Sequence, residues 1–154
     1  MKIYSAAISD FNFILRANAE ISGVSNQAEI DKASQARLKN DLFGAYPRCH
    51  AIMAEADGVP IGMALYSTCY FANEGQIMWV SQIYVLPEYR RHIATGLLMR
   101  RLNEIALENG WPYICSGVDK DNAAMGQTLI RAGAKSLENF HLYSVKAKNS
   151  VNVS

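Results

Sequence analysis

The sequence predicts an α/β domain of the α+β type, and three observations lead to this prediction. Residues 77–102 pass from a stretch rich in β-branched and aromatic side chains, through Pro87 and a basic turn, into apolar side chains at helical spacing. Two turn signals, Asp57-Gly58 and Asn73-Glu74-Gly75, divide the residues before Pro87 into three strands. The remaining periodicity gives the element order β-α-α-β-β-β-α-β-α-β.

The first 50 residues contain one predicted strand and two predicted helices. Residues 2–7 read as a short apolar strand, and Ser9 or Asp10 can cap the helix that follows. Gly23 ends that helix. A second helix is expected over residues 27–42, because its apolar residues lie near one face and charged residues fill the other.

The rest of the chain is expected to alternate between strands and helices. Asn109-Gly110 ends the helix after the basic turn by the usual αL stop, and the last helix is capped at Asn122 and closed by Gly133. Five further strands are predicted, over residues 50–56, 60–70, 77–86, 113–118 and 140–145.

Composition limits the chain to one globular domain. Its 154 residues, half of them hydrophobic, suffice for one core, expected over residues 1–146 with a polar tail over 147–154. A formal charge of +1 disfavours binding of nucleic acid. No run approaches the roughly 20 apolar residues of a membrane span, and the N-terminus lacks the apolar stretch of a signal peptide. We expect a cytoplasmic protein that does not bind membranes.

The cysteines predict neither a metal site nor a disulfide framework. They are odd in number and widely spaced, without a Cys-x-x-Cys pair. We interpret Cys49, Cys69 and Cys115 as buried thiols of a reducing compartment.

A basic turn, Arg90, Arg91 and His92, stands immediately before the central helix. A helix N-terminus presents unpaired N–H groups and the positive end of the helix dipole, so this turn favours a phosphate-bearing ligand. Many strand–turn–helix units with basic turns bind nothing, and spacing alone leaves both interpretations open.

The segment Val85-Leu-Pro-Glu-Tyr-Arg90, followed by an apolar helix, resembles motif A of the GNAT superfamily of acyl-CoA-dependent N-acetyltransferases. The resemblance covers about residues 2–143. It implies the GNAT fold, with a mixed central sheet of about six to seven strands flanked by about four helices. It also implies that the sheet splays between the strands at 77–86 and 113–118, and that acetyl-CoA enters this gap.

A gapless alignment with that motif puts Arg90 at its Arg/Gln place, Ile93 at its first glycine, and Thr95 at a glycine or alanine. A β-branched residue disfavours positive φ, at a cost of roughly 1–3 kcal/mol, so the loop is expected to differ from the family's. A second alignment deletes one glycine and places Ile93, Ala94 and Thr95 on family-like residues. The apolar helix face that includes Leu98 favours the gapless alignment.

The resemblance also implies the cofactor site. In the family, a backbone N–H at the end of the fourth strand stabilises the oxyanion, while the loop and its amides hold phosphates. Asn122 either bonds the pantetheine arm or is a plain N-cap. No metal is expected. The other residues implied for acetyl-CoA are Ile83, Tyr84, Val85, Arg90, Arg91, His92, Ile93, Ala94, Thr95 and Gly96.

Within the superfamily, residues 41–50 are similar to the polyamine and thialysine acetyltransferase branch. Leu129 stands where that branch has a tyrosine that protonates the CoA sulfur, and Ser81 and Gln82 stand where it has two acidic residues. We expect Ser81 to position a water that deprotonates the amine and Tyr84 to face the gap, although a core position explains Tyr84 equally well. Other side chains that could face the gap are Tyr66, His50 and Glu74.

The sequence therefore predicts an N-acetyltransferase that transfers acetyl from acetyl-CoA to a small primary amine, either a polyamine or an amino-acid side chain. The alternative is a catalytically impaired GNAT-fold module that binds an acyl-CoA or a protein partner, which Ser81, Ile93 and Leu129 favour. Nucleic-acid binding through the arginines at 90, 91, 100 and 101 is disfavoured by the near-neutral charge. A homodimer is expected from the resemblance alone.

Overall fold

The computed structural model describes residues 1–23, 31–90, 93–137 and 144. The chain divides into two compact units, residues 1–117 and 118–154. The first contains a sheet with helices on both faces, and the second contains helix α4 (Ala123–Arg131). The single domain predicted over residues 1–146 stays a prediction.

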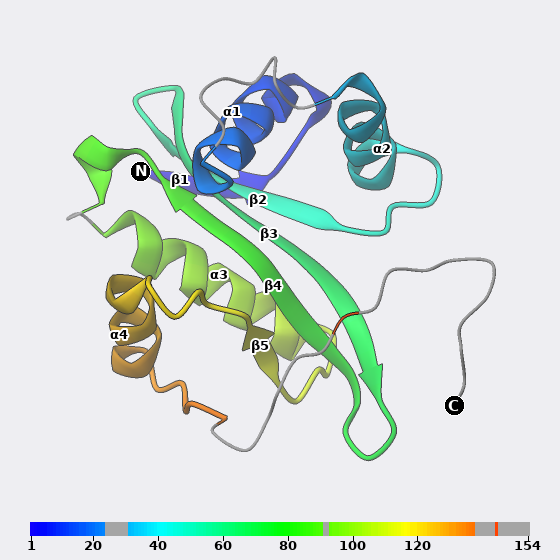
Figure 1. Cartoon of the computed structure of the whole chain (residues 1–154), viewed down its shortest axis with the longest axis vertical. Helices are drawn as coiled ribbons and strands as arrows, with labels where there is room; N and C mark the ends of the chain where they lie inside the picture. Colours follow the sequence, from blue (N-terminus) through cyan, green and yellow to red (C-terminus); the bar gives the residue numbers. More distant parts are fainter. Residues whose placement is uncertain (24–30, 91–92, 138–143, 145–154) are drawn as a thin grey trace. The chain divides into compact units, whose positions relative to one another are not determined.

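The first unit is built on one mixed sheet of five strands in the order β1-β2-β3-β4-β5 (Figure 1). The first four strands pair antiparallel with their neighbours, and β5 runs parallel to β4. This confirms the α+β class and the mixed sheet. The strands are β1 (Lys2–Ser5), β2 (His50–Ala56), β3 (Val59–Phe71), β4 (Gly75–Val85) and β5 (Ile114–Ser116).

The predicted number of six to seven strands is wrong for the described residues, which form five. The predicted sixth strand covered residues 140–145, of which only Ser144 is described, and Ser144 lies outside any strand. The strand predicted over residues 113–118 is also shorter, because only Ile114–Ser116 pairs with β4.

The predicted number of about four helices is confirmed by α4 and three helices of the first unit. α1 (Phe11–Ile21) and α2 (Lys32–Phe43) cover one face of the sheet, and α3 (Ala94–Glu108) covers the other (Figure 1). Two 3-10 turns, η1 (Ile8–Asp10) and η3 (Pro87–Tyr89), precede α1 and α3.

Two helix starts differ from their predictions. α2 begins at Lys32 because Asp31 caps it, accepting a hydrogen bond from the Ser34 N–H (2.9 Å). Residues 27–30, where this helix was predicted to begin, lie outside the described residues. Asp10 does not cap α1 with its side chain. Its buried carboxylate instead accepts from the Ala7 N–H (2.8 Å) and the Tyr4 hydroxyl (3.1 Å), which ties β1 to η1.

The sheet separates two hydrophobic clusters. On one face, Leu98 and Leu102 of α3 pack against side chains of β2, β3 and β4 such as Met78. On the other face, Ile14 of α1 packs against residues that include Met63 of β3. Both faces are therefore covered, which fixes the strand register against slippage by one residue.

The Asp57-Gly58 hairpin is confirmed. Both residues have positive φ, 51° and 80°, which is the geometry of the two-residue turn that matches strand twist. Cys49, Cys69 and Cys115 are free, as predicted, but half-buried rather than buried. Among the described residues, no helix combines the length and apolar character that crossing a membrane requires.

We expect Leu98→Ala to destabilise the protein by about 2–5 kcal/mol, because Leu98 is fully buried and the substitution leaves a cavity under α3. Leu107→Ala is the matched control, since Leu107 lies on the same helix with 70% of its surface exposed, and should change stability by no more than about 0.5 kcal/mol. Urea unfolding measures both. Equal effects would contradict the packing described.

Candidate active site

The predicted catalytic strand, β4, contains one irregularity. Its register with β3 shifts between Val80, which lies opposite Tyr66, and Gln82, which lies opposite Leu65. Ser81 is the extra residue of this β-bulge. It is exposed, and its hydroxyl donates to the Leu65 carbonyl (3.2 Å).

The bulge changes which residues of β4 face α3. Met78 and Val80 pack in the α3-side cluster before the bulge, and Ile83 and Val85 pack there after it. A regular strand alternates and would have kept the even-numbered residues on that face. Tyr84 therefore packs on the opposite face, with α1 and α2.

The same change directs two backbone N–H groups. In an extended strand of L-residues, residues whose side chains lie on the same face of the sheet also have their N–H groups on the same edge of the strand. The Met78 N–H donates to the Tyr113 carbonyl, beside β5 (3.0 Å). The N–H groups of Ile83 and Val85 accordingly point to the β5 edge as well.

β5 does not extend along this part of β4. The ladder between the two strands runs from Met78 opposite Ile114 to Val80 opposite Ser116. Beyond it, residues 81–85 of β4 have no neighbouring strand on that edge within the described part of the chain. The pairing of β4 with β5 thus ends at Val80. These are the two strands between which the resemblance implied a splay.

The N-terminus of α3 has an uncapped first turn. Ile93 precedes it with φ −71°, in the right-handed helical region, and 67% of its surface is exposed. The cost expected from a β-branched residue at positive φ therefore does not arise. The Ile93 side chain makes no capping hydrogen bond, and the Leu97 N–H donates to the Ile93 carbonyl (2.9 Å).

The three residues at the start of α3 differ in exposure. Ala94 is fully buried, Thr95 is half-buried and Gly96 is exposed. A Cβ built on Gly96 would meet no atom within 4 Å. The space beside the first turn is therefore open, because Gly96 has no side chain and the Ile93 side chain is exposed to solvent.

Arg90 is anchored at the end of β4. Its Nε donates to the Val85 carbonyl (2.9 Å), and its guanidinium carbon lies 5.9 Å from the centroid of the Tyr84 ring. Arg91 and His92, the other members of the predicted basic turn, lie outside the described residues.

A polar cluster that was not predicted joins α1 to β4 beyond the bulge. Tyr84 is only 4% exposed, and its hydroxyl donates to the Glu20 carboxylate at the end of α1. One half-turn earlier, Asn18 accepts from the Gln82 side-chain amide (2.8 Å). The sequence does contain a signal for Glu20, because an acidic residue in the last turn of a helix is unfavourable for the helix dipole.

Tyr84 is held in its protonated form. Burial, followed by the hydrogen bond to Glu20 and its negative charge, raises the pKa of Tyr84 to about 12, against the opposing effect of Arg90 and Arg16. At neutral pH the phenol is therefore a hydrogen-bond donor and not a base.

The remaining candidates have structural contacts. Asn122, in the second unit, is the N-cap of α4 and accepts from the Met125 N–H (3.2 Å). Its bond to a pantetheine arm stays a prediction. Tyr66 is buried, with its ring 5.3 Å from that of His50, and Glu74 is an exposed turn residue.

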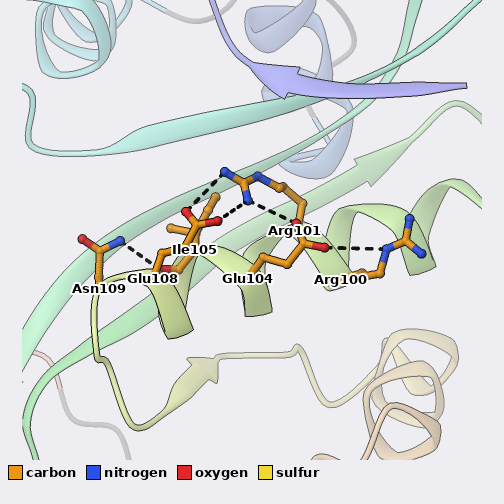
Figure 2. Close-up of polar contacts among 6 residues, drawn as sticks. All are labelled: Arg100, Arg101, Glu104, Ile105, Glu108 and Asn109. Atoms are coloured by element: carbon orange, nitrogen blue, oxygen red, sulfur yellow. Dashed lines mark hydrogen bonds and ion pairs between the residues drawn. The ribbon is translucent and has the colours of Figure 1, made fainter.

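The basic residues on α3 are paired with acids. Figure 2 shows Arg101 bonded to Glu104 (3.1 Å) and Glu108 (2.8 Å), and Arg100 near Glu104 (3.9 Å). Two of the four arginines considered for nucleic-acid binding, Arg100 and Arg101, thus have acidic partners on their own helix. The described residues contain no group of three or more His, Cys, Asp or Glu side chains placed to hold a metal ion.

A family model of acetyltransferases, the GNAT family, matches residues 16–133. The chain belongs to the GNAT family. The thialysine N-epsilon-acetyltransferase of Bos taurus is 31% identical over 116 residues, which are 70% of this chain and 68% of that protein. The spermidine/spermine N(1)-acetyltransferase-like protein 1 of Homo sapiens is 25% identical over 113 residues, 69% of this chain and 16% of that protein.

The GNAT fold also agrees with solved structures. An aminoglycoside N-acetyltransferase in complex with CoA superposes with a TM-score of 0.78 at 15% identity, covering 95% of each chain. The predicted GNAT resemblance, including its polyamine and thialysine branch, is confirmed. The homodimer and the cytoplasmic location stay predictions.

We expect Tyr84 to ionise about two pH units above an ordinary phenol, whose pKa is about 10. Because the folded-state pKa is the higher one, its contribution to stability is complete below about pH 10 and is lost between about pH 10 and 12. The measurement is the phenolate absorbance of the native protein minus that of Tyr84→Phe, which should show a transition near pH 12. Glu20→Gln should move this transition to lower pH, since it removes the negative charge. A difference transition at pH 10 would contradict the buried, bonded phenol.

Proposed function

We propose that this GNAT protein is an acetyl-CoA-dependent N-acetyltransferase that acts on a small primary amine. The observation that carries the proposal is that β4 ends in an open edge, residues 81–85, and leads through η3 into the uncapped first turn of α3. The open edge of β4 suits the thioester, and the first turn of α3 suits the diphosphate. The family match and the names of the curated relatives support acetyl transfer to an amine.

The first turn of α3 fits the diphosphate of CoA. Ala94, Thr95 and Gly96 are its first three residues, and the N–H groups of a first helical turn, together with the helix dipole, favour an anion. The room above Gly96 and the outward side chain of Ile93 allow the close approach that a glycine provides elsewhere in the family. Arg90, Arg91 and His92 would add positive charge.

The open edge of β4 fits acyl transfer. The N–H groups of Ile83 and Val85 would stabilise the oxyanion that forms when a neutral amine attacks the thioester carbon. A C–N bond forms, the C–S bond breaks, the amine proton passes to water, and CoA leaves with its sulfur protonated by solvent. Ser81, whose hydroxyl proton is directed at Leu65, would accept a hydrogen bond from that water.

Tyr84 has a supporting part in this proposal. Its proton is held by Glu20, and its ring lies in the cluster between the sheet and α1. We propose that it fixes the strand end at which the oxyanion donors lie. With Leu129 in place of the branch's tyrosine, the departing thiolate takes its proton from water.

The test is acetyl-CoA-dependent thiol release with a panel of amines, together with thermal stabilisation by acetyl-CoA. A ligand at 100 times its Kd adds about 2.7 kcal/mol of stability. Stabilisation with amine-dependent thiol release supports the transferase. Stabilisation without release on any amine indicates the impaired, acyl-CoA-binding module, and absence of both contradicts the proposal.

The diphosphate site predicts opposite effects of one substitution on stability and on binding. In Gly96→Glu, a carboxylate at the first turn of α3 favours the helix by about 0.3–1 kcal/mol, on top of about 0.5–1 kcal/mol from replacing glycine. The same charge repels a diphosphate and should weaken acetyl-CoA binding about tenfold.

Gly96→Gln is the matched control, with nearly the same shape and no charge. Calorimetric titration should give it a Kd for acetyl-CoA at least several times lower than that of Gly96→Glu, while thermal unfolding finds both variants at least as stable as the native protein. Equal affinity in the two variants would remove the first turn of α3 from the cofactor site.

A further inference from the structure

The open edge at the end of β4 carries carbonyl oxygens as well as N–H groups. In an antiparallel pair, the N–H and the C=O of one residue point to the same edge, and successive residues alternate between the two edges. The N–H of Leu86, the residue after β4, donates to the Ile61 carbonyl of β3 (2.9 Å). Ile83 and Val85 therefore direct both their N–H groups and their carbonyls away from β3, to the edge that β5 leaves open.

These carbonyls oppose the reaction proposed for this edge. An oxyanion that accepts from the Val85 N–H lies close to carbonyl oxygens, whose partial negative charge repels it. A hydrogen-bond donor placed on such a carbonyl offsets part of this repulsion. The edge therefore stabilises an oxyanion best where a neighbouring carbonyl already has a donor of its own.

The carbonyl of Val85 has such a donor in the Arg90 side chain. The Nε of Arg90 donates to this oxygen at 2.9 Å. Because the guanidinium is charged, the bond is stronger than one between neutral groups. It also brings a positive charge next to the peptide group of Val85. Arg90 thus offsets the carbonyl of the same residue whose N–H faces the open edge.

The local chain holds Arg90 in this position. η3 begins with Pro87, and the Arg90 N–H donates to the Pro87 carbonyl (3.3 Å), so the chain turns back beside the strand end. The guanidinium lies over the Tyr84 ring, 5.9 Å from its centroid. Tyr84 is itself fixed by its bond to Glu20. The Arg90 side chain is therefore held by the strand end and by an aromatic ring that does not move freely.

These contacts limit what Arg90 can contribute to a diphosphate. Since its Nε bonds the Val85 carbonyl, the guanidinium cannot offer a phosphate the pair of parallel bonds that includes Nε. Across residues 1–23, 31–90 and 93–137, Arg90 makes no ion pair, whereas Arg48, Arg100 and Arg101 each do. No acidic side chain of that part of the protein therefore neutralises its charge at the strand end.

We propose that Arg90 is a positioning residue of the acetyl transfer, which bonds the Val85 carbonyl and so lets the N–H groups on the open edge stabilise the oxyanion. This rests on the proposed function and gives Arg90 a role at the thioester besides any role at the phosphates. Arg90 acts through the peptide group of Val85 and touches no reacting atom. Because the negative charge on the oxygen is largest in the transition state, loss of this bond should lower kcat.

The experiment compares two neutral substitutions and two thioesters. Glutamine carries its amide nitrogen as many bonds from Cα as the Nε of arginine, so Arg90→Gln keeps a donor for Val85 and loses the charge. Arg90→Met has a similar length and no donor. S-acetylpantetheine has the thioester arm of acetyl-CoA without its phosphates, so loss of a phosphate contact does not affect it. Thiol release is measured with the amine of the panel that reacts fastest.

With S-acetylpantetheine, we expect Arg90→Met to lower kcat about tenfold with KM within about twofold, and Arg90→Gln to keep kcat within about threefold of the native value. Arg100→Met is the control, because it removes a charge from an exposed position on α3, and it should change neither constant. A merely structural role would raise KM for acetyl-CoA through the first turn of α3 and leave kcat with S-acetylpantetheine unchanged.

Two results of this comparison overturn the proposal and leave the transferase intact. One is an equal kcat of Arg90→Met and Arg90→Gln with S-acetylpantetheine. The other is a loss in Arg90→Met that occurs only with acetyl-CoA, which would assign Arg90 to the phosphates alone.

Binding without an amine separates this proposal from the proposed function. NMR titration with S-acetylpantetheine should shift the amides of Ile83 and Val85 in the native protein and in Arg90→Gln, and shift them less in Arg90→Met. If no amine supports thiol release but the shifts follow this order, the role of Arg90 stands and the transferase fails. If S-acetylpantetheine neither binds nor reacts, the proposal for Arg90 fails whatever acetyl-CoA does.

Discussion

The bulge at Ser81 is the constraint on which the rest of this structure depends. One extra residue in β4, held by the bond from its hydroxyl to Leu65, changes the face of every residue that follows. Without it, Tyr84 would face α3, and the N–H groups of Ile83 and Val85 would point at β3 and form hydrogen bonds with that strand. Because of it, they lie on the edge that β5 leaves open after Val80.

The bulge also determines on which face of the sheet the polar side chains that follow it lie. Gln82 and Tyr84 are turned toward α1, where Asn18 and Glu20 bond them. Two helices therefore meet the same short segment of strand, with α3 beginning just beyond its end and α1 covering its opposite face. We propose that the first turn of α3 contributes amides for an anion, so that the strand end lies beside the cofactor.

Much of the fold follows from local signals in the sequence. Asp57-Gly58 predicts its hairpin, and the spacing of Leu98 and its neighbours predicts the buried face of α3, because turn geometry and helical periodicity are local properties. The bulge was not predicted, because β4 reads as a continuous β-rich stretch and only its partner strand reveals the extra residue. The direction of Tyr84 was left open for the same reason.

The candidate site shows the same division. Its residues at the end of β4 and the start of α3 are contiguous in sequence, so a motif can mark them. The bond between Tyr84 and Glu20 joins residues 64 positions apart. The sequence marks Glu20 as unfavourable in the last turn of α1, but no local pattern indicates which residue it bonds. Ile93 was expected to disturb the loop, but that expectation assumed a positive φ which the helix start does not use.

The most direct test of the central claim is a backbone amide NMR titration of the native protein with CoA. The account predicts that the largest shift changes fall on Ile83, Val85 and the first turn of α3, Ala94 to Gly96, while amides around the hollow lined by Ile8, Phe43 and Gly44 beside α2 stay unchanged. Shift changes confined to that hollow, or spread evenly over the chain, would contradict a cofactor site at the open end of β4.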